Sequence, residues 1–304
     1  MKSFDAIPST EAYGLALKCT LSEQQLKINS FPRPGGAPGK AILDNYYGQY
    51  HPLLSSNSNM RTCRRCRASF SIDCYNSPGK AGTCVSHPKS VYRRYGQGYH
   101  ICCNGREFST GCEIGDYHVS EQFDFNNMTG FVTTQPPLSG YECSTADIFA
   151  VDCEMCYTVE NLELTKISVV DINGNVVLDT LVKPHNRIID YNTRFSGITK
   201  EMMDSVTVDL AWVQQKLLSM FHSQTILVGH SLDHDLLALK MVHSCVVDTS
   251  ILFPHRLGLP RRQGLVQICE KLLGRTIRAR GHDSSEDADA CIQLLKYHIR
   301  TRLM

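Results

Sequence analysis

The chain has 304 residues, of which 42 % are hydrophobic and 20 % charged, proportions that are ordinary for a folded protein of one or two domains. A formal net charge of +1 excludes overall electrostatic steering toward nucleic acid or membrane, and without a run of about 18 apolar residues no membrane span is predicted. Fourteen cysteines without the apolar core of a signal peptide favour reduced thiols or bound metal over disulfides, and therefore a nuclear or cytoplasmic location.

Residues 1–60 are rich in turn-forming residues, with prolines and glycines from Pro32 to Gly39 and a Ser/Asn cluster at 55–59. One amphipathic helix is predicted between Glu11 and Ile28. No chemistry is indicated here, and we expect residues 1–60 to form a partly ordered N-terminal arm.

Residues 61–120 contain paired metal-ligand types at Cys63, Cys66, Cys84, His87, Cys102, Cys103, Cys112 and His118. Spacings of the Cys-x-x-Cys and Cys-x-x-His kind let two side chains reach one tetrahedral ion, so this segment predicts a module with two closed, structural zinc sites. The alternatives are buried free thiols or disulfides. The spacing does not show which ligands share an ion, and a sequential and an interleaved arrangement fit equally well.

The same segment is locally basic and contains Tyr92, Tyr95 and Tyr99. Its cations are Arg61, Arg64, Arg65, Arg67, Lys80, Lys89, Arg93, Arg94 and Arg106. Basic and aromatic residues interleaved in this way suit phosphate contact and base stacking on a single-stranded nucleic acid. The alternative is a solvated surface around a small zinc fold.

A polar linker is predicted at 121–146, and residues 147–304 form the second domain. Its predicted strands are 147–153, 164–171, 176–182, 225–229 and 245–247, and its predicted helices are 200–220, a helix capped by Ser231, 262–273 and 284–300. Three strands with a hairpin turn at Asn173–Gly174, followed by alternating helices and strands, predict an α/β fold with a mixed five-stranded sheet and helices on both faces.

Acidic residues gather at the ends of these elements. Asp152 and Glu154 share one face of the first strand, where a divalent cation would relieve their repulsion, although an edge strand with a solvated face needs no cation. Asp235 follows the 225–229 strand, at the edge where open α/β sheets place their sites. Asp287 lies in the first turn of the last helix, where a capping box with Ser284 is the alternative explanation, and His282 lies just outside that helix.

These residues, in this order, resemble the DEDDh class of 3′→5′ exonucleases. The segments Phe-Ala-Val-Asp-Cys-Glu-Met-Cys-Tyr-Thr (149–158), Val-Gly-His-Ser-Leu (228–232), Phe-Pro-His-Arg-Leu-Gly-Leu-Pro (253–260) and Gly-His-Asp-Ser-Ser-Glu-Asp-Ala (281–288) are similar to the Rex-type RNA exonuclease family, on its RNA exonuclease 1 and GOR-antigen branch. The Cys/His array also resembles the CHORD type of two-zinc module. Two departures are His234 and a shortened segment between Pro260 and His282.

The resemblance implies an RNase H-like fold and hydrolysis of single-stranded RNA from its 3′ end. It implies that Asp152, Glu154, Asp235 and Asp287 hold two Mg²⁺ or Mn²⁺ ions and that His282 is the general base. It further implies that the terminal nucleotide is held by Met155, Phe195, Ser196, Gly197 and Ile198. Two other hypotheses remain: a catalytically silent scaffold that binds RNA or protein through the zinc module, and a DNA 3′→5′ exonuclease.

Overall fold

The structure is a computed structural model that describes residues 4–44, 59–76, 83–122, 124, 128–279 and 281–303. The Ser/Asn cluster at 55–59, apart from Asn59, and Lys80 lie outside these residues. No helix in the described ranges is long and apolar enough to cross a membrane.

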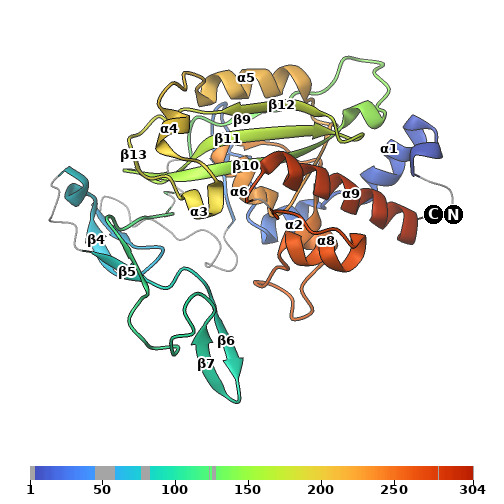
Figure 1. Ribbon diagram of the computed structural model, residues 1–304. Helices are drawn as coiled ribbons and strands as arrows, with labels where there is room; N and C mark the ends of the chain where they lie inside the picture. Colours follow the sequence, from blue (N-terminus) through green and yellow to red (C-terminus); the bar gives the residue numbers. More distant parts are fainter. Residues whose placement is uncertain are drawn as a thin grey trace.

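A mixed sheet of six strands lies at the centre of the molecule (Figure 1). In spatial order its strands are β12 (Val176–Leu181), β11 (Leu162–Asp171), β10 (Ile148–Thr158), β14 (Ile226–Gly229) and β16 (Val246–Asp248), with β13 (Ile188–Asp190) paired to the far end of β10. The first three strands are antiparallel, and β10, β14 and β16 are parallel. The predicted α/β fold and mixed sheet are confirmed; β13 is a sixth strand that was not predicted.

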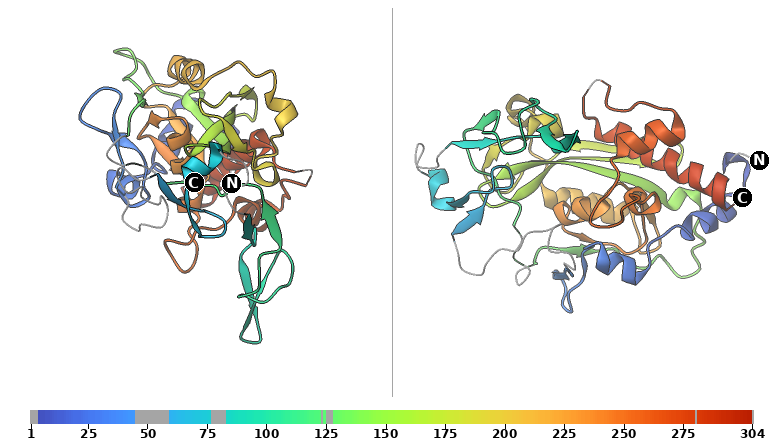
Figure 2. Two further views of the ribbon diagram at one scale, coloured as in Figure 1. Left: turned by 90° about the vertical axis from the view of Figure 1, so that its left-hand side faces the viewer. Right: turned by 90° about the horizontal axis from the view of Figure 1, so that it is seen from below.

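Strand β10 is central because its apolar side chains supply both cores of the molecule. Ile148 and Ala150 pack in a core with helices α8 (Leu265–Leu273) and α9 (Ser284–Arg302). Val151 and Cys153 face the other core, formed with α5 (Leu210–Met220) and α6 (Leu232–Ala238). The view from below in Figure 2 shows α8 and α9 on one side of the sheet and α6 on the other. This alternation carries the face of Asp152 and Glu154 toward the α9 side.

Two predicted helices are each divided in the structure. The segment 200–220 forms α4 (Lys200–Met203) and α5, because the Asp209 carboxylate accepts a hydrogen bond from Trp212 N and starts a new helix. The segment 11–28 forms α1 (Ser9–Leu17) and α2 (Glu23–Ile28), with a reciprocal capping box between Ser22 and Gln25. Local capping therefore ends a helix that the apolar pattern alone would continue.

The shorter elements connect these layers. They are η1 (Phe4–Ala6), β1 (Arg33–Pro34), β2 (Ala41–Ile42), β9 (Val132–Thr133), η3 (Thr145–Asp147), α3 (Thr193–Ser196), β15 (Met241–Val242) and α7 (Thr249–Leu252). The N-terminal residues pack closely on the sheet domain: Tyr13 and Ala16 join the α8/α9 core, and Leu26 and Phe31 join the α5/α6 core. The predicted linker also packs there, since β9 pairs with β15.

The Cys/His-rich segment consists of short two-stranded ladders and one small core. Its elements are β3 (Met60–Thr62), β4 (Ser69–Ser71), η2 (Ile72–Asn76), β5 (Cys84–Ser86), β6 (Val91–Arg94), β7 (Gln97–His100) and β8 (Glu113–Gly115). The strands pair as β3 with β4, β5 with β8 and β6 with β7. Figures 1 and 2 show the β6–β7 hairpin projecting away from the sheet domain.

Candidate functional site

Four acidic side chains from three elements converge at one end of the sheet. Asp152 and Glu154 come from β10, Asp235 from α6 and Asp287 from the first turn of α9. Burial, together with the charges of Asp235, Asp287 and Glu154, raises the pKa of Asp152 well above its ordinary value. In the described part of the chain, no three of these carboxylates have their ligand oxygens within 4.8 Å of one another.

The neighbouring carboxyl groups show the same electrostatic strain. Burial and then the charge of Asp287 raise the pKa of Glu154 to about 8. Burial likewise raises the pKa of Asp235 to about 8, although the Cys153 amide donates a 2.8 Å hydrogen bond to Asp235 Oδ1. These raised values mean that the group carries more negative charge than its protein surroundings neutralise.

A divalent cation fits this group by the chemistry of its donors. Carboxylate oxygens are the ligands that Mg²⁺ and Mn²⁺ prefer, and one doubly charged ion would offset the repulsion that raises these pKa values. Arg278 already places one positive charge there: its Nη2 lies 2.6 Å from Asp287 Oδ2. Arg278 was not predicted from the sequence. The structure shows that it lies in an irregular segment with a left-handed φ of 63°.

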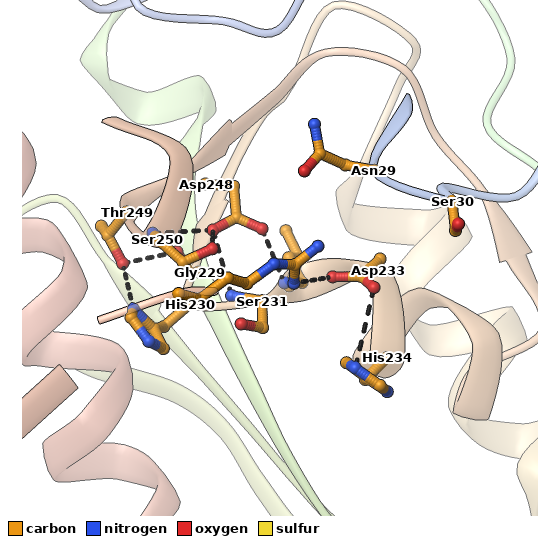
Figure 3. A network of polar contacts seen from close by, with 12 residues as sticks. Asn29, Ser30, Gly229, His230, Ser231, Asp233, His234, Asp248, Thr249 and Ser250 are labelled. Atoms are coloured by element: carbon orange, nitrogen blue, oxygen red, sulfur yellow. Dashed lines mark hydrogen bonds and ion pairs between the residues drawn. The ribbon is translucent and has the colours of Figure 1, made fainter. Parts of the chain in front are cut away.

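Helix α6 is held in place by a buried carboxylate at the end of β16. Asp248 accepts hydrogen bonds from the amides of Ser231 and Leu232, both at 3.0 Å, and from the Ser250 hydroxyl at 2.6 Å (Figure 3). Ser231 was predicted to cap this helix, but its side chain makes no capping hydrogen bond, and Asp248 satisfies the first amides instead. Because Asp235 lies in the first turn of this helix, the Asp248 contacts fix its position.

The first turn of α6 is also anchored to the loop that precedes α8. Arg262 Nη1 donates a 2.6 Å hydrogen bond to Asp233, which is completely buried, and His234 Nε2 lies 3.7 Å from the same carboxylate (Figure 3). The unusual His234 is therefore part of an ion-pair network beside the acid group.

The start of α9 places His282 and Asp287 together. The N-cap is Asp283, whose carboxylate accepts from Ser285 N, and not Ser284 as in the alternative explanation. The Ser284 hydroxyl instead lies 2.6 Å from that of Ser168. The capping-box explanation for Asp287 is therefore wrong. His282 is half-buried, and burial and the nearby Arg278 charge lower its pKa, so its neutral form is favoured.

The five predicted nucleotide-binding residues lie close by but differ in exposure. Met155 follows Glu154 where the β10–β11 register shifts, and Phe195 has 45 % of its surface exposed. Gly197 has a φ of 67°, and a Cβ there would lie 3.3 Å from the His282 carbonyl oxygen, so this turn packs directly on His282. Ser196 and Ile198 are buried. The Ser196 hydroxyl donates a hydrogen bond to the Tyr191 carbonyl and accepts one from the Ile198 amide.

The eight predicted zinc ligands form two separate groups. One consists of Cys63, Cys66, Cys84 and His118, and the other of His87, Cys102, Cys103 and Cys112, each with its ligand atoms within 4.8 Å of one another. The second group lies in the chain between Cys84 and His118, so the arrangement is nested rather than sequential.

The distances within these groups suit tetrahedral zinc. Cys63 Sγ and Cys84 Sγ are 3.6 Å apart, and Cys102 Sγ and Cys112 Sγ are 3.5 Å apart. Sulfurs bound to one tetrahedral zinc at about 2.3 Å would be separated by about 3.7 Å. The residues therefore fit two closed four-ligand sites.

A third group, not predicted from the sequence, consists of Cys143, Asp147 and His222. Asp147 accepts hydrogen bonds from the Tyr141 hydroxyl at 2.8 Å and the Ser144 amide at 2.9 Å, and His222 Nε2 lies 3.0 Å from it. These contacts account for the buried carboxylate without a metal.

Residues 149–295 match the sequence model of the exonuclease family, RNase_T. The chain is 39 % identical over 308 residues to exonuclease GOR of Pan troglodytes, 42 % identical over 294 residues to RNA exonuclease 1 homolog of Homo sapiens, and 35 % identical over 253 residues to RNA exonuclease 3 of Schizosaccharomyces pombe.

These alignments cover 99 %, 92 % and 80 % of the present chain, but 44 %, 23 % and 44 % of the respective relatives, so the chain spans less than half of their length. A solved structure of the Neurospora crassa Pan2 catalytic unit, with its protease and nuclease domain, is 23 % identical with a TM-score of 0.47, and the match covers 56 % of this chain and 30 % of that one.

The class defined by the fold and the sequence match is that of nucleases with an RNase H-like α/β domain. Residues 149–295 belong to the exonuclease family, and homologues of the chain include proteins named RNA exonuclease 1 homolog and exonuclease GOR, which confirms the predicted resemblance.

Proposed function

We propose that this protein is a metal-dependent exoribonuclease that hydrolyses single-stranded RNA from its 3′ end. The observation that carries the proposal is the convergence of four buried or half-buried carboxylates from β10, α6 and α9 beside His282, with raised pKa values for Asp152, Glu154 and Asp235. The sequence match to the exonuclease family and the names of the homologous RNA exonucleases support it.

Asp152, Glu154, Asp235 and Asp287 would hold two Mg²⁺ or Mn²⁺ ions, which supply activation of water and stabilisation of the leaving oxygen. His282 would accept the proton of the attacking water, and its lowered pKa keeps the ring neutral for this task. Phe195 offers an exposed ring on which the terminal base could stack, and Met155 lies on the strand beside the acids. The packing of Gly197 on His282 would fix the position of the terminal nucleotide relative to His282, the proposed general base.

The Cys/His groups would bind two structural zinc ions. Closed four-ligand sites leave no position for water, so the zinc would stabilise the module and not take part in hydrolysis. Only a few apolar residues pack between the short ladders of this segment, and metal binding would supply the missing stability.

The test is a time course on a 5′-labelled single-stranded RNA with Mg²⁺ or Mn²⁺. We expect a ladder that shortens from the 3′ end, with losses of at least about 100-fold for Asp152→Asn and for His282→Ala. Asp171→Asn, in an exposed turn, and His298→Ala, near the other end of α9, are the matched controls and should retain activity. Absence of degradation by the folded, zinc-loaded protein in either metal would contradict the proposal, and preferential loss of a DNA competitor would redirect it to DNA.

A further inference from the structure

A cleft of about 820 Å³ separates the Cys/His module from the sheet domain. One wall comes from the segments around Arg67 and Lys89, and the other from β13 and from α3, which carries Phe195. The charged residues that line the cleft are the carboxylates Glu113, Glu121 and Asp190 and the cations Arg64, Arg65, Arg67, Lys89 and Arg194.

Each carboxylate of the cleft is already paired. Arg64 Nε lies 2.7 Å from Glu121, Arg65 Nη1 lies 2.5 Å from Asp190, and Arg194 Nη1 lies 2.5 Å from Glu113. In the ranges that the structure describes, neither Arg67 nor Lys89 forms an ion pair with a carboxylate. The cleft therefore presents two uncompensated positive charges, which suits a polyanion.

The candidate zinc groups hold these two cations in place. Arg67 directly follows the ligand Cys66, and its amide donates a 3.1 Å hydrogen bond to the Cys63 carbonyl; Lys89 follows the ligand His87 by two residues. The Arg65–Asp190 pair, which is only partly exposed, joins this wall to β13. The spacing between the cations and the sheet domain is therefore set by the fold and not by flexible side chains alone.

The cleft borders the turn that packs on His282. Phe195 lines the cleft with 45 % of its surface exposed, and two residues later Gly197 packs against His282. An exposed aromatic ring between a basic wall and the candidate general base suits a strand of stacked bases with a phosphate backbone, and an acidic peptide would not use that ring.

We propose that this cleft is the channel for the single-stranded RNA that precedes the 3′-terminal nucleotide, an inference that rests on the proposed function. Arg67 and Lys89 contact its backbone phosphates, so the Cys/His module is part of the substrate-binding surface and not only a structural appendage. Dinucleotides would reach only the acid group and the residues that hold the terminal nucleotide, whereas longer RNA would also occupy the cleft.

The experiment compares the full chain with Arg67→Gln/Lys89→Gln, using a labelled oligouridylate of about 12 nucleotides, within the usual site sizes for single strands. Binding is measured by fluorescence anisotropy without added Mg²⁺ or Mn²⁺, which prevents cleavage, and without chelator, which retains zinc. We expect about tenfold weaker binding, and a dependence of log K on log salt that is shallower by about 1.4 for the two lost phosphate contacts.

The matched control is Arg94→Gln/Arg106→Gln, which removes the same charge from exposed positions of the same module outside the cleft. Equal binding by the wild type and the cleft variant, or equal losses in both double variants, would overturn the proposal. If the double variant loses zinc, the single variant Lys89→Gln carries the test, with about threefold weaker RNA binding expected. Arg67→Lys, which keeps the positive charge, should bind RNA as the wild type does. Because the assay measures binding, failure of the proposed hydrolysis would leave this result readable by itself.

Discussion

The guanidinium of Arg278 donates hydrogen bonds to both carboxylate oxygens of Asp287. Its Nε lies 3.0 Å from Oδ1 and 2.9 Å from Oδ2, and the Asp287 side chain is completely buried. The same positive charge partly counteracts the rise in the pKa of Asp152 and of Glu154. A fixed cation therefore lies inside the group of acids that would bind divalent metal.

Removing this cation should strengthen metal binding. We expect Arg278→Gln to bind Mn²⁺ about tenfold more tightly, equivalent to ~1.4 kcal/mol, because Asp287 would no longer have to exchange one cation for another. An electron paramagnetic resonance titration with Mn²⁺ measures this. Arg275→Gln, which breaks pairs with Glu286 and Asp289 outside the four acids, is the control and should change little. Unchanged or weaker binding by Arg278→Gln would show that Arg278 does not compete with metal.

The role of Arg278 also shows where prediction from the sequence ends. The acids could be predicted because strand alternation puts Asp152 and Glu154 on one face, and because sites in α/β sheets follow strand ends, where Asp235 lies. Arg278 lies in an irregular segment before α9, and its partner is determined only when that segment packs on the sheet. Neither periodicity nor a motif indicates such a contact.

The grouping of the zinc ligands has a similar cause. Cys-x-x-Cys spacing predicts local pairs, but the partner pair depends on which strands meet. Strand β5 pairs with β8, with Cys84 opposite Gly115, and this brings Cys84 near His118 while the residues between them loop outward with the second group. The ladder is tertiary information, so the sequence left both arrangements open.

The raised carboxyl pKa values predict a pH-dependent stability. Glu154 and Asp235 titrate at about 8 in the folded protein and near their ordinary values when unfolded, so the folded state binds more protons between about pH 5 and pH 8. Without divalent metal, the free energy of unfolding should therefore fall as pH rises, by on the order of 4 kcal/mol from pH 6 to pH 8 for the two groups together. Urea unfolding at the two pH values measures this.

Saturating Mg²⁺ should abolish that fall, because bound metal replaces the protons. Glu154→Gln should flatten the dependence in metal-free buffer, whereas Glu160→Gln, at an exposed position, should not. If the unfolding free energy of the metal-free wild type does not change between the two pH values, or rises with pH, the pKa values of these carboxyl groups are not raised in the folded state.

The Asp248 contacts predict a large cost for one buried carboxylate. Asp248→Ala leaves the Ser231 and Leu232 amides without their acceptor, and we expect a loss of about 3 kcal/mol in unfolding free energy. It should also weaken Mn²⁺ binding, because α6 carries Asp235. Asp209→Ala, which removes a single capping bond from the exposed start of α5, should cost only about 1 kcal/mol. Equal losses in urea unfolding would mean that Asp248 does not hold α6.

The nested zinc arrangement can be separated from a sequential one by counting ions in double variants. Cys63 and His118 share one group in the structure, whereas Cys84 and His87 belong to different groups. Cys63→Ser/His118→Ala should therefore lose about one zinc per chain and Cys84→Ser/His87→Ala about two, since a four-ligand site that lacks a ligand binds far more weakly. Sequential pairing reverses the two outcomes, because Cys84 and His87 would then share an ion and Cys63 and His118 would not. Zinc content by mass spectrometry after extensive dialysis decides between them, and retention of both ions in both variants would exclude these residues as ligands.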